Sequence, residues 1–303
     1  DVTIVSLHYP FTKKSYCWHG IKVYPLGAAN RTLVRKFQLK NALNNVLMQI
    51  NSEKKIDILH SFWLNEATLF TSSFANKWNV PHIVTAMGQD VLSSNRWLKK
   101  LKFPKFKLVT ISAFQKGFLL QQGISSNREI PWGIIESDWV DKTIDIVGVG
   151  NLIPLKNFSY FLELVAEVRS VLPNLKVQIV GDGPMKKELE EQTVSLGLSE
   201  TVSFLGEQNY EQTQLLIAQS KVLLHPANFE GFGMVFIEAM SNQTYVLSQK
   251  VGFMLDREAD FLTLDLKVDA RHLEKLVTSS APQKELFLIS ETVNQYLEMY
   301  YEL

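Results

Sequence analysis

The chain has 303 residues, of which 46% are hydrophobic and 20% charged, and its 31 basic side chains balance 31 acidic ones. Such a composition is that of an ordinary globular protein, and the length suggests two domains. The single cysteine, Cys17, excludes a disulfide framework within the chain and a site built from several thiolates, which favours a reducing compartment. Because the apolar runs are also too short to span a bilayer, we expect a cytoplasmic protein.

The neutral net charge hides an asymmetry between the two halves. Residues 1–141 carry 18 Lys and Arg against 9 Asp and Glu, a balance of +9, whereas residues 142–303 carry 13 against 22, a balance of −9. Opposite charge on the two halves predicts two domains, 1–141 and 142–303, that face different partners.

The first half alternates short apolar runs with helical periodicity. Strands are predicted at 2–7, 57–60, 81–85 and 107–111, and helices near 33–50, 64–78 and 113–121. Between them, Trp97–Lys107 interleaves basic and apolar residues. This stretch is either a solvated face or a contact with an anionic membrane surface. It is accompanied by no recognisable nucleic-acid motif, so no nucleic-acid partner is expected.

The second half repeats the alternation more clearly. Strands are predicted at 144–149, 177–180, 201–205 and 221–225, and helices near 158–172, 184–196 and 210–219. Alternating strands and helices predict a parallel sheet with helices on both faces. We therefore expect an α/β protein of two doubly wound domains facing each other across a cleft, with ligands bound by loops at the carboxyl ends of the strands.

The most informative segment runs from His225 to Met240, where a strand ends, a loop with two glycines follows and a helix begins near Gly233. Free N–H groups at a helix start, beside glycines that let a ligand approach, suit a diphosphate. Glu238 falls on an otherwise apolar helix, where ribose hydroxyls would satisfy its carboxylate. The plainer alternative is a helix start that tolerates a glutamate.

This segment, with Glu230 and Glu238 separated by seven residues, resembles the signature of the family 4 glycosyltransferases (glycosyl transferases group 1). Segments 148–157, 179–184, 202–206 and 84–90 resemble further motifs of the family in the same order. The resemblance implies a retaining enzyme with the GT-B fold and a nucleotide-diphosphate sugar as donor substrate. It also implies that the terminal helix, 288–302, packs back on the first domain.

The resemblance assigns roles to individual residues. Glu230 would hold hydroxyls of the transferred sugar, and Lys156 would pair with the diphosphate, so both are candidate catalytic residues. Glu238 would hold the ribose. The remaining candidates for donor binding are Gly150, Asn151, Gly206, Glu207, Gly231, Phe232, Gly233 and Met234. The candidates for the sugar or acceptor side of the cleft are His60, Met87 and Gly88.

Two departures from the family pattern bear on turnover. The family usually has Arg at the position of Asn151 and His at the position of Met87, so a phosphate cation and an imidazole are missing. The chain contains no Asp-x-Asp, which argues against a metal-clamped donor, and neither a metal nor a cofactor is expected. The acceptor would be a sugar or a lipid-linked molecule, such as a precursor of a cell-surface polysaccharide.

The sequence is also compatible with other functions. The chain could bind a nucleotide sugar without turning it over, or it could be a nucleotide-sugar epimerase on the same fold. An oxidoreductase would explain Gly148 and Gly150, but the third glycine of a dinucleotide fingerprint is replaced by Ile153. His60 could line the cleft or have a structural role, and a structural role is expected for His225.

Overall fold

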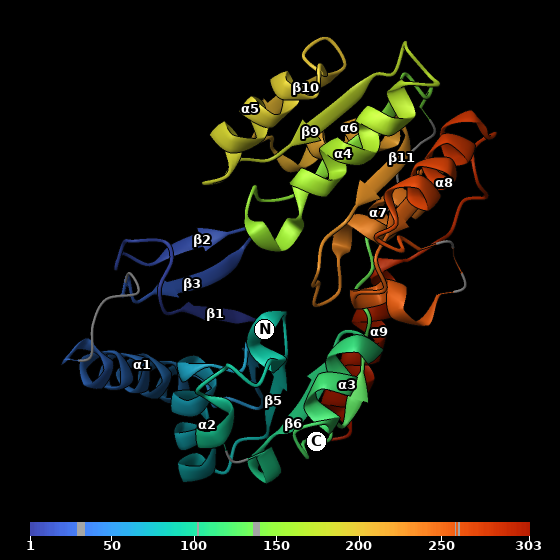
Figure 1. The fold of residues 1–303 in the computed structure, drawn as a ribbon. Coiled ribbons are helices and arrows are strands. Elements are labelled where there is room, and N and C mark those ends of the chain that lie inside the picture. Colours follow the sequence, from blue (N-terminus) through green and yellow to red (C-terminus); the bar gives the residue numbers. More distant parts are fainter. Residues whose placement is uncertain (29–33, 102, 136–139, 258, 260) are drawn as a thin grey trace. The chain divides into compact units, whose positions relative to one another are not determined.

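The computed structural model describes residues 1–28, 34–101, 103–135, 140–257, 259 and 261–303, which form two compact units (Figure 1). The N-terminal unit comprises Asp1–Thr110, Lys116–Glu129 and Tyr300–Leu303, and the C-terminal unit comprises Ile111–Gln115 and Ile130–Met299. The chain thus passes between the units more than once. Residues 136–139, in the expected boundary region, lie outside the described residues.

The N-terminal unit contains two small sheets. The first has the order β1-β3-β2, with β1 (Thr3–Ser6) parallel to β3 (Ile21–Pro25) and β2 (Tyr16–Trp18) antiparallel at its edge. The second is wholly parallel with the order β4-β5-β6-β7. Its strands are β4 (Leu59–Phe62), β5 (His82–Thr85), β6 (Lys107–Thr110) and β7 (Arg128–Glu129).

Among the described residues, three helices accompany these strands: α1 (Val34–Glu53), α2 (Glu66–Trp78) and α3 (Ala113–Leu120), whose first three residues belong to the C-terminal unit. Local chemistry defines the ends of α2. Before it, the side chain of Asn65 accepts a hydrogen bond from the N–H of Ala67 at 2.8 Å, and after it Asn79 adopts the left-handed conformation common at helix ends. Leu43 and Leu47 of α1 pack with Phe74 of α2 in one apolar cluster.

The C-terminal unit is built on one parallel sheet with the order β10-β9-β8-β11-β12. Its strands are β8 (Ile144–Val149), β9 (Val177–Val180), β10 (Val202–Gly206), β11 (Ser220–His225) and β12 (Tyr245–Ser248). Its helices are α4 (Phe158–Arg169), α5 (Lys186–Ser195), α6 (Tyr210–Ala218), α7 (Met234–Ser241), α8 (Leu266–Thr278) and α9 (Ile289–Tyr301), whose last two residues belong to the N-terminal unit. Short 3-10 turns occur at Gln89–Val91, Leu98–Lys100, Phe103–Lys105, Pro154–Lys156 and Gly252–Asp256.

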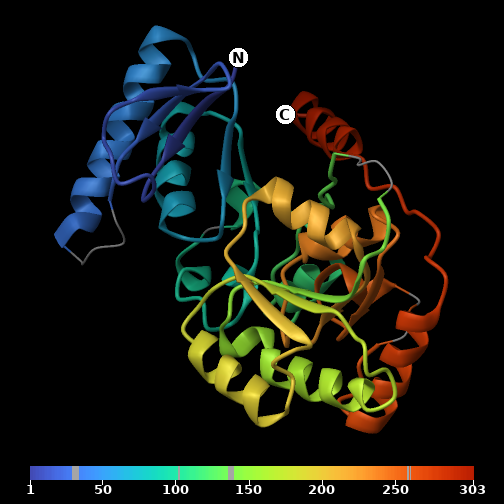
Figure 2. The ribbon, with the colours of Figure 1, turned by 90° about the horizontal axis from the view of Figure 1, so that it is seen from above.

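Helices bury both faces of this sheet (Figure 2). Successive strand residues point to opposite faces, so Ile146 packs in a cluster with residues of α4, α5 and α8, whereas Val147 packs with residues of α6 and α7. Val222 and Leu223 of β11 divide in the same way. Strands covered on both faces explain why these segments are continuously apolar in the sequence.

The structure confirms the predicted α/β class and most of the expected elements, with differences at particular strands. The strand expected at 57–60 occurs at Leu59–Phe62, and the sequence analysis predicts no strand at β2, β3, β7 or β12. The predicted helix at 33–50 continues to Glu53. Among the described residues, no helix combines the length and the apolar character that a membrane crossing requires.

Candidate functional site

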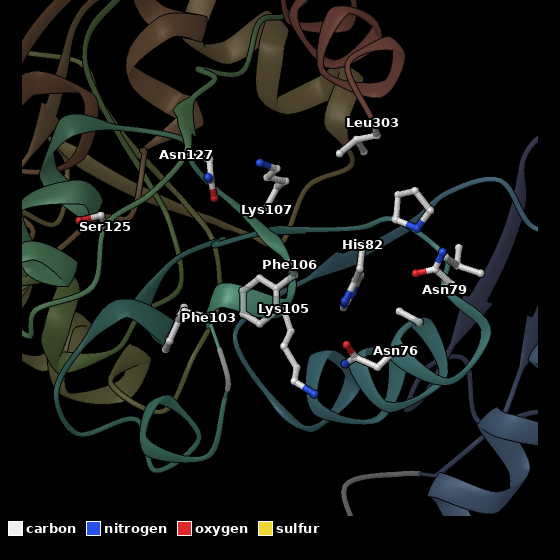
Figure 3. Close-up of a pocket in the computed structure, with 13 residues that line it drawn as sticks. Asn76, Asn79, His82, Phe103, Lys105, Phe106, Lys107, Ser125, Asn127 and Leu303 are labelled. Carbon is white, nitrogen blue, oxygen red and sulfur yellow. The ribbon is translucent and has the colours of Figure 1, made fainter.

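A pocket of about 670 Å³ opens on the N-terminal unit (Figure 3). His82 and Lys107, which line it, are the first residues of β5 and β6, and Asn127 directly precedes β7. The pocket thus lies at the amino ends of parallel strands, whereas open α/β sheets bind their ligands outside the carboxyl ends. The pocket and the predicted donor site belong to different units, and two of the pocket's lining residues, Lys105 and Lys107, belong to the basic stretch.

In the C-terminal unit, the topology itself points to a ligand site. The order of the strands reverses between β8 and β11, because β9 and β10 extend the sheet on one side and β12 on the other. Ligands of doubly wound sheets bind at such a switch point. The loops after β8 and β11 meet there, since the N–H of Asn228 donates to the carbonyl oxygen of Leu155 at 2.9 Å.

The loop after β8 carries Lys156 to this point. A Cβ on Gly181 would lie only 2.0 Å from the carbonyl oxygen of Gly150, so the ends of β8 and β9 approach each other as closely as glycine permits. The aliphatic stem of Lys156 lies over Gly150, whose own Cβ would be 3.6 Å from Cε of the lysine. Lys156 ends the 3-10 turn, and Asn157 directly precedes α4 as its N-cap residue.

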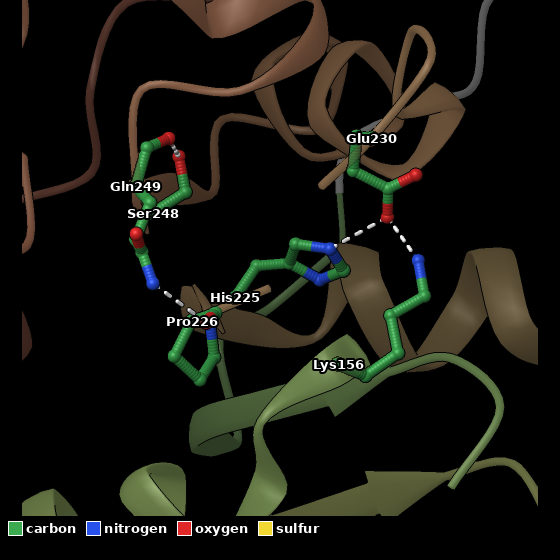
Figure 4. Close-up of polar contacts among 6 residues, drawn as sticks. All are labelled: Lys156, His225, Pro226, Glu230, Ser248 and Gln249. Atoms are coloured by element: carbon green, nitrogen blue, oxygen red, sulfur yellow. Dashed lines mark hydrogen bonds and ion pairs between the residues drawn. The ribbon is translucent and has the colours of Figure 1, made fainter. Parts of the chain in front are cut away.

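The loop after β11 brings Glu230 to Lys156 (Figure 4). Oε1 of Glu230 accepts a hydrogen bond from Nζ of Lys156 and lies 2.8 Å from Nε2 of His225. The side chains of Lys156 and Glu230 are 17% and 16% exposed, and that of His225 is 4% exposed, so the cluster is shielded yet open to a ligand. Both contacts use Oε1, and among the described residues Oε2 has no hydrogen-bond partner.

The pKa shifts define the charges of this cluster. Burial alone raises the pKa of Glu230, but the hydrogen bond and charge of His225, together with the ammonium of Lys156, outweigh it, so the net pKa is below its ordinary value. Burial lowers the pKa of His225 more than Glu230 raises it. At neutral pH the site therefore holds a carboxylate beside a neutral imidazole that donates from Nε2.

Helix α7 begins at the same loop. Gly233 precedes it with a φ of 82° and gives the helix no side-chain cap, so its first N–H groups point toward the loop. The carbonyl oxygen of Gly231 accepts a hydrogen bond at 2.6 Å from the hydroxyl of Ser112, which fixes the glycine loop from a second segment of the C-terminal unit. Phe232 is buried, whereas Met234 is half-buried at the helix start.

Glu238 lies one turn further along α7 and is 8% exposed. Burial raises the pKa of its carboxyl group, and the amide of Gln214 on α6 partly opposes that shift. The pKa of Tyr210 is raised, mainly by burial and in addition by the nearby carboxylate of Glu238. A buried carboxyl group on an apolar helix, beside an amide and a phenol, is a group that ligand hydroxyls would satisfy.

The other predicted donor residues lie at the ends of neighbouring strands. Gly206 ends β10 with a φ of 70°, and its carbonyl oxygen accepts from the N–H of Gly181 at 2.8 Å. Glu207 and Asn151 are exposed in the loops that follow β10 and β8. These residues thus share the carboxyl edge of the sheet with Lys156, although Asn151 makes no side-chain contact among those described.

The three residues predicted for the sugar or acceptor side lie in the N-terminal unit. Both ring nitrogens of His60 are engaged, Nδ1 with the hydroxyl of Tyr300 at 2.6 Å and Nε2 with that of Thr85 at 2.8 Å. Burial lowers the pKa of His60 to about 4. The structural reading of His60 accounts for these contacts, and a role at the acceptor stays a prediction. Met87 and Gly88 follow β5 and donate their N–H groups to Asp90.

Sequence reasoning missed three residues at these sites. The sequence assigns His225 a structural role, does not single out Ser112, and includes Asp90 only as the last residue of the segment 84–90. Their positions depend on loop conformations that bring a strand end beside a residue several positions away. The signal available for His225 is its place at the end of a strand directly before the Glu230 loop.

Part of the chain matches a known family. Residues 135–263 match the model of the family Glycosyl transferases group 1. An uncharacterized glycosyltransferase of Methanocaldococcus jannaschii, MJ1178, is 23% identical over 206 residues, which cover 65% of this chain and 57% of that protein. The phosphatidylinositol N-acetylglucosaminyltransferase gpi3 subunit of Schizosaccharomyces pombe is 30% identical over 109 residues, covering 36% of this chain and 24% of the subunit.

Among solved structures, the Anabaena protein Alr3699/HepE in complex with UDP and glucose superposes with a TM-score of 0.70 at 17% identity, over 94% of this chain and 87% of that chain. The chain therefore has the GT-B fold. The match over residues 135–263 confirms the resemblance to the group 1 glycosyl transferases. The chain spans little more than half the length of the first curated relative.

Proposed function

We propose that this protein transfers a sugar from a nucleotide-diphosphate sugar to an acceptor. The observation that carries the proposal is the convergence of Lys156 and Glu230, from the loops after β8 and β11, at the switch point of the C-terminal sheet beside the start of α7. A cation, a carboxylate and free helix N–H groups are what a diphosphate and a sugar require together.

The chemistry of these groups supports one binding mode for the donor. Lys156 and the start of α7 bind the diphosphate, and Oε2 of Glu230 accepts hydrogen bonds from hydroxyls of the sugar. The carboxylate of Glu238 accepts hydrogen bonds from the ribose hydroxyls, which supplies the partners that a buried carboxylate requires. The backbone at Gly206 and Glu207 contacts the base. The structure of HepE was determined with UDP and glucose, which supports a nucleotide-sugar donor of this kind.

The transfer proceeds with retention. The bond between C1 of the sugar and the diphosphate oxygen breaks, and its electron pair remains on the phosphate. The acceptor oxygen forms the new bond to C1 on the same face and gives its proton to a phosphate oxygen. Lys156 stabilises the negative charge that grows on the leaving group, which is where fixed positive charge lowers a barrier. No residue of the chain needs to act as a nucleophile, and no metal is required.

A lipid-linked acceptor is proposed on two grounds. One relative is named for transfer to phosphatidylinositol. The basic stretch Trp97–Lys107 adds a cationic surface on the N-terminal unit, where Lys100 lies 5.2 Å from the centre of the Trp97 ring. Lys102 of this stretch lies outside the described residues. We propose that the stretch docks reversibly on an anionic membrane surface.

A panel of nucleotide sugars tests the proposed function. Release of the nucleoside diphosphate is measured for each donor, with and without a chelator, while the sugar is followed by mass spectrometry. Hydrolysis or transfer that survives the chelator supports a metal-independent transferase. Tight donor binding without release would instead mark a binding protein in which Met87 and Asn151 have ended turnover. Exchange of solvent deuterium into an untransferred sugar would reveal an epimerase.

A further inference from the structure

Trp63 stands in an unusual backbone conformation directly after β4. Its φ is 73°, in the left-handed region that bulky side chains avoid. The conformation is held from both sides, because its N–H donates to Thr85 at 2.9 Å and its carbonyl oxygen accepts from the hydroxyl of Thr68 at 2.6 Å. Backbone strain held this firmly is concentrated in proteins at ligand sites.

The strain does not bury the indole ring, since Trp63 is 45% exposed. The ring reaches the loop after β5, where a Cβ on Gly88 would lie 3.5 Å from its atoms Cη2 and Cζ3. The ring therefore stands at the carboxyl edge of the parallel sheet, the edge at which such sheets bind ligands. An aromatic face at this place is a platform for the C–H face of a ligand ring.

Asp90 makes the platform rigid. Its carboxylate is 8% exposed and accepts hydrogen bonds from the N–H of Leu64 at 2.7 Å and from that of Gly88 at 2.7 Å. Burial raises the pKa of Asp90, and these N–H groups oppose the shift. One side chain thus ties the loop that carries Trp63 to the loop against which the ring rests, so that the ring is pre-positioned for a ligand.

A polar pair lies at the same edge. Glu66 is the first residue of α2, three positions after Trp63, and its Oε1 lies 3.3 Å from Nε2 of His8, which follows β1. The two side chains are 16% and 21% exposed. Neither was singled out as a site residue in the sequence. A partly shielded carboxylate beside an imidazole is suited to bind neighbouring hydroxyl groups.

We propose that Trp63, Glu66 and His8 form a subsite for a pyranose ring of the acceptor. The indole stacks on the C–H face of the ring, while Glu66 and His8 hold its hydroxyls. The acceptor is then a glycan that presents a sugar ring, free or lipid-linked, rather than a bare lipid alcohol or a protein hydroxyl. This inference rests on the proposed transferase function, whose donor groups lie in the C-terminal unit.

The test measures glycoside binding directly, without the donor. Methyl glycosides of glucose, galactose, mannose and N-acetylglucosamine are examined by saturation-transfer NMR on the full chain, with 1-octanol as a probe that has no sugar ring. At least one glycoside should bind through protons of one ring face. Trp63→Ala should weaken its binding at least 10-fold, Trp63→Phe should retain most of it, and Glu66→Gln should weaken it without changing the stacked protons.

Trp78→Ala is the matched control, because Trp78 is a similarly exposed tryptophan at the opposite end of α2. It should leave glycoside binding unchanged, and thermal unfolding checks that each variant is folded. Equal glycoside binding by wild type and Trp63→Ala, or binding of 1-octanol alone, would overturn the proposed subsite. Titration of the wild-type protein with nucleotide sugars separates the two proposals. If the protein binds glycosides but no nucleotide sugar, the proposed transferase function is contradicted and the proposed sugar subsite is retained.

Discussion

The imidazole Nε2 of His225 lies 2.8 Å from Oε1 of Glu230, the oxygen that also pairs with Lys156. The ring of Phe236 fixes the imidazole from the side, at 5.1 Å between ring centroids and at 90°. His225 is therefore a positioning residue. It orients the carboxylate, keeps the pKa of Glu230 low and, by engaging Oε1, leaves Oε2 for the proposed contact with the sugar.

Removal of His225 should lower turnover more than donor binding. We expect His225→Ala to reduce kcat about 10-fold, with an unchanged Kd for the nucleoside diphosphate, because general positioning of this kind affects the reacting geometry. The acid limb of the pH–rate profile should move to higher pH, since the hydrogen bond that lowers the pKa of Glu230 is lost. His225→Gln, whose amide nitrogen can donate in place of Nε2, should restore part of the rate. A purely structural histidine would leave the acid limb in place.

Lys156→Ala should weaken binding of a nucleoside diphosphate about 10- to 100-fold, the range for loss of a charge-assisted hydrogen bond. Binding of the free nucleoside should change little, because it carries no phosphate. Isothermal titration with both ligands measures the difference. The assignment of Lys156 to the diphosphate fails when both affinities fall equally.

Acid should destabilise the fold through His82. Burial and the nearby His60 lower its pKa to about 4, and its ring is enclosed by the hydroxyls of Ser61, Thr71 and Ser72. The unfolded chain binds this proton near pH 6.5, whereas the folded chain does not bind it until about pH 4. Stability is therefore full above pH 6.5 and falls as the pH drops toward 4, by as much as ~3 kcal/mol for this group.

Urea unfolding at pH 7, 6 and 5 measures this slope, and His82→Gln should make it shallower. The His82 account is wrong when the variant and the wild type lose stability in parallel.

Membrane docking should depend on the basic stretch. Each Lys near an anionic leaflet contributes about 1 kcal/mol, and the attraction decays within roughly 8 Å at physiological salt. Wild type should sediment with phosphatidylserine vesicles at low salt and be released at high salt. A variant with glutamine at five lysines of the stretch should no longer sediment with the vesicles. The five positions are Lys99, Lys100, Lys102, Lys105 and Lys107. Five exposed lysines of the C-terminal unit provide a control of equal charge change: Lys176, Lys187, Lys250, Lys267 and Lys275.

Binding by the five-glutamine variant at the wild-type level would exclude this surface. The basic half would then require an acidic acceptor in solution.

Periodicity predicted four of the five strands of the C-terminal sheet, because these strands form short apolar runs. It missed the edge strand Tyr245–Ser248, whose first two residues are only partly buried. The same reasoning missed Tyr16–Trp18, whose side chains are all exposed at a sheet edge and show no alternation. It placed β4 two residues early because the partly polar segment His60–Ser61 masks the end of the strand. Residues such as Asp90 and Ser112 act across loops, and no period in the sequence relates a loop residue to the backbone that it holds.

The role of Glu230 is the central claim, and the rate of sugar transfer by Glu230→Gln tests it most directly. The variant keeps the size of the side chain and removes the charged carboxylate that accepts hydrogen bonds from the sugar hydroxyls. We predict a rate lower by at least about 100-fold, an unchanged Kd for the nucleoside diphosphate and a protein that still unfolds cooperatively, although at a lower midpoint because Lys156 loses its carboxylate partner. Glu190→Gln, the same exchange on the exposed face of α5, should transfer at the wild-type rate. A folded Glu230→Gln protein that transfers sugar as fast as wild type would contradict the account.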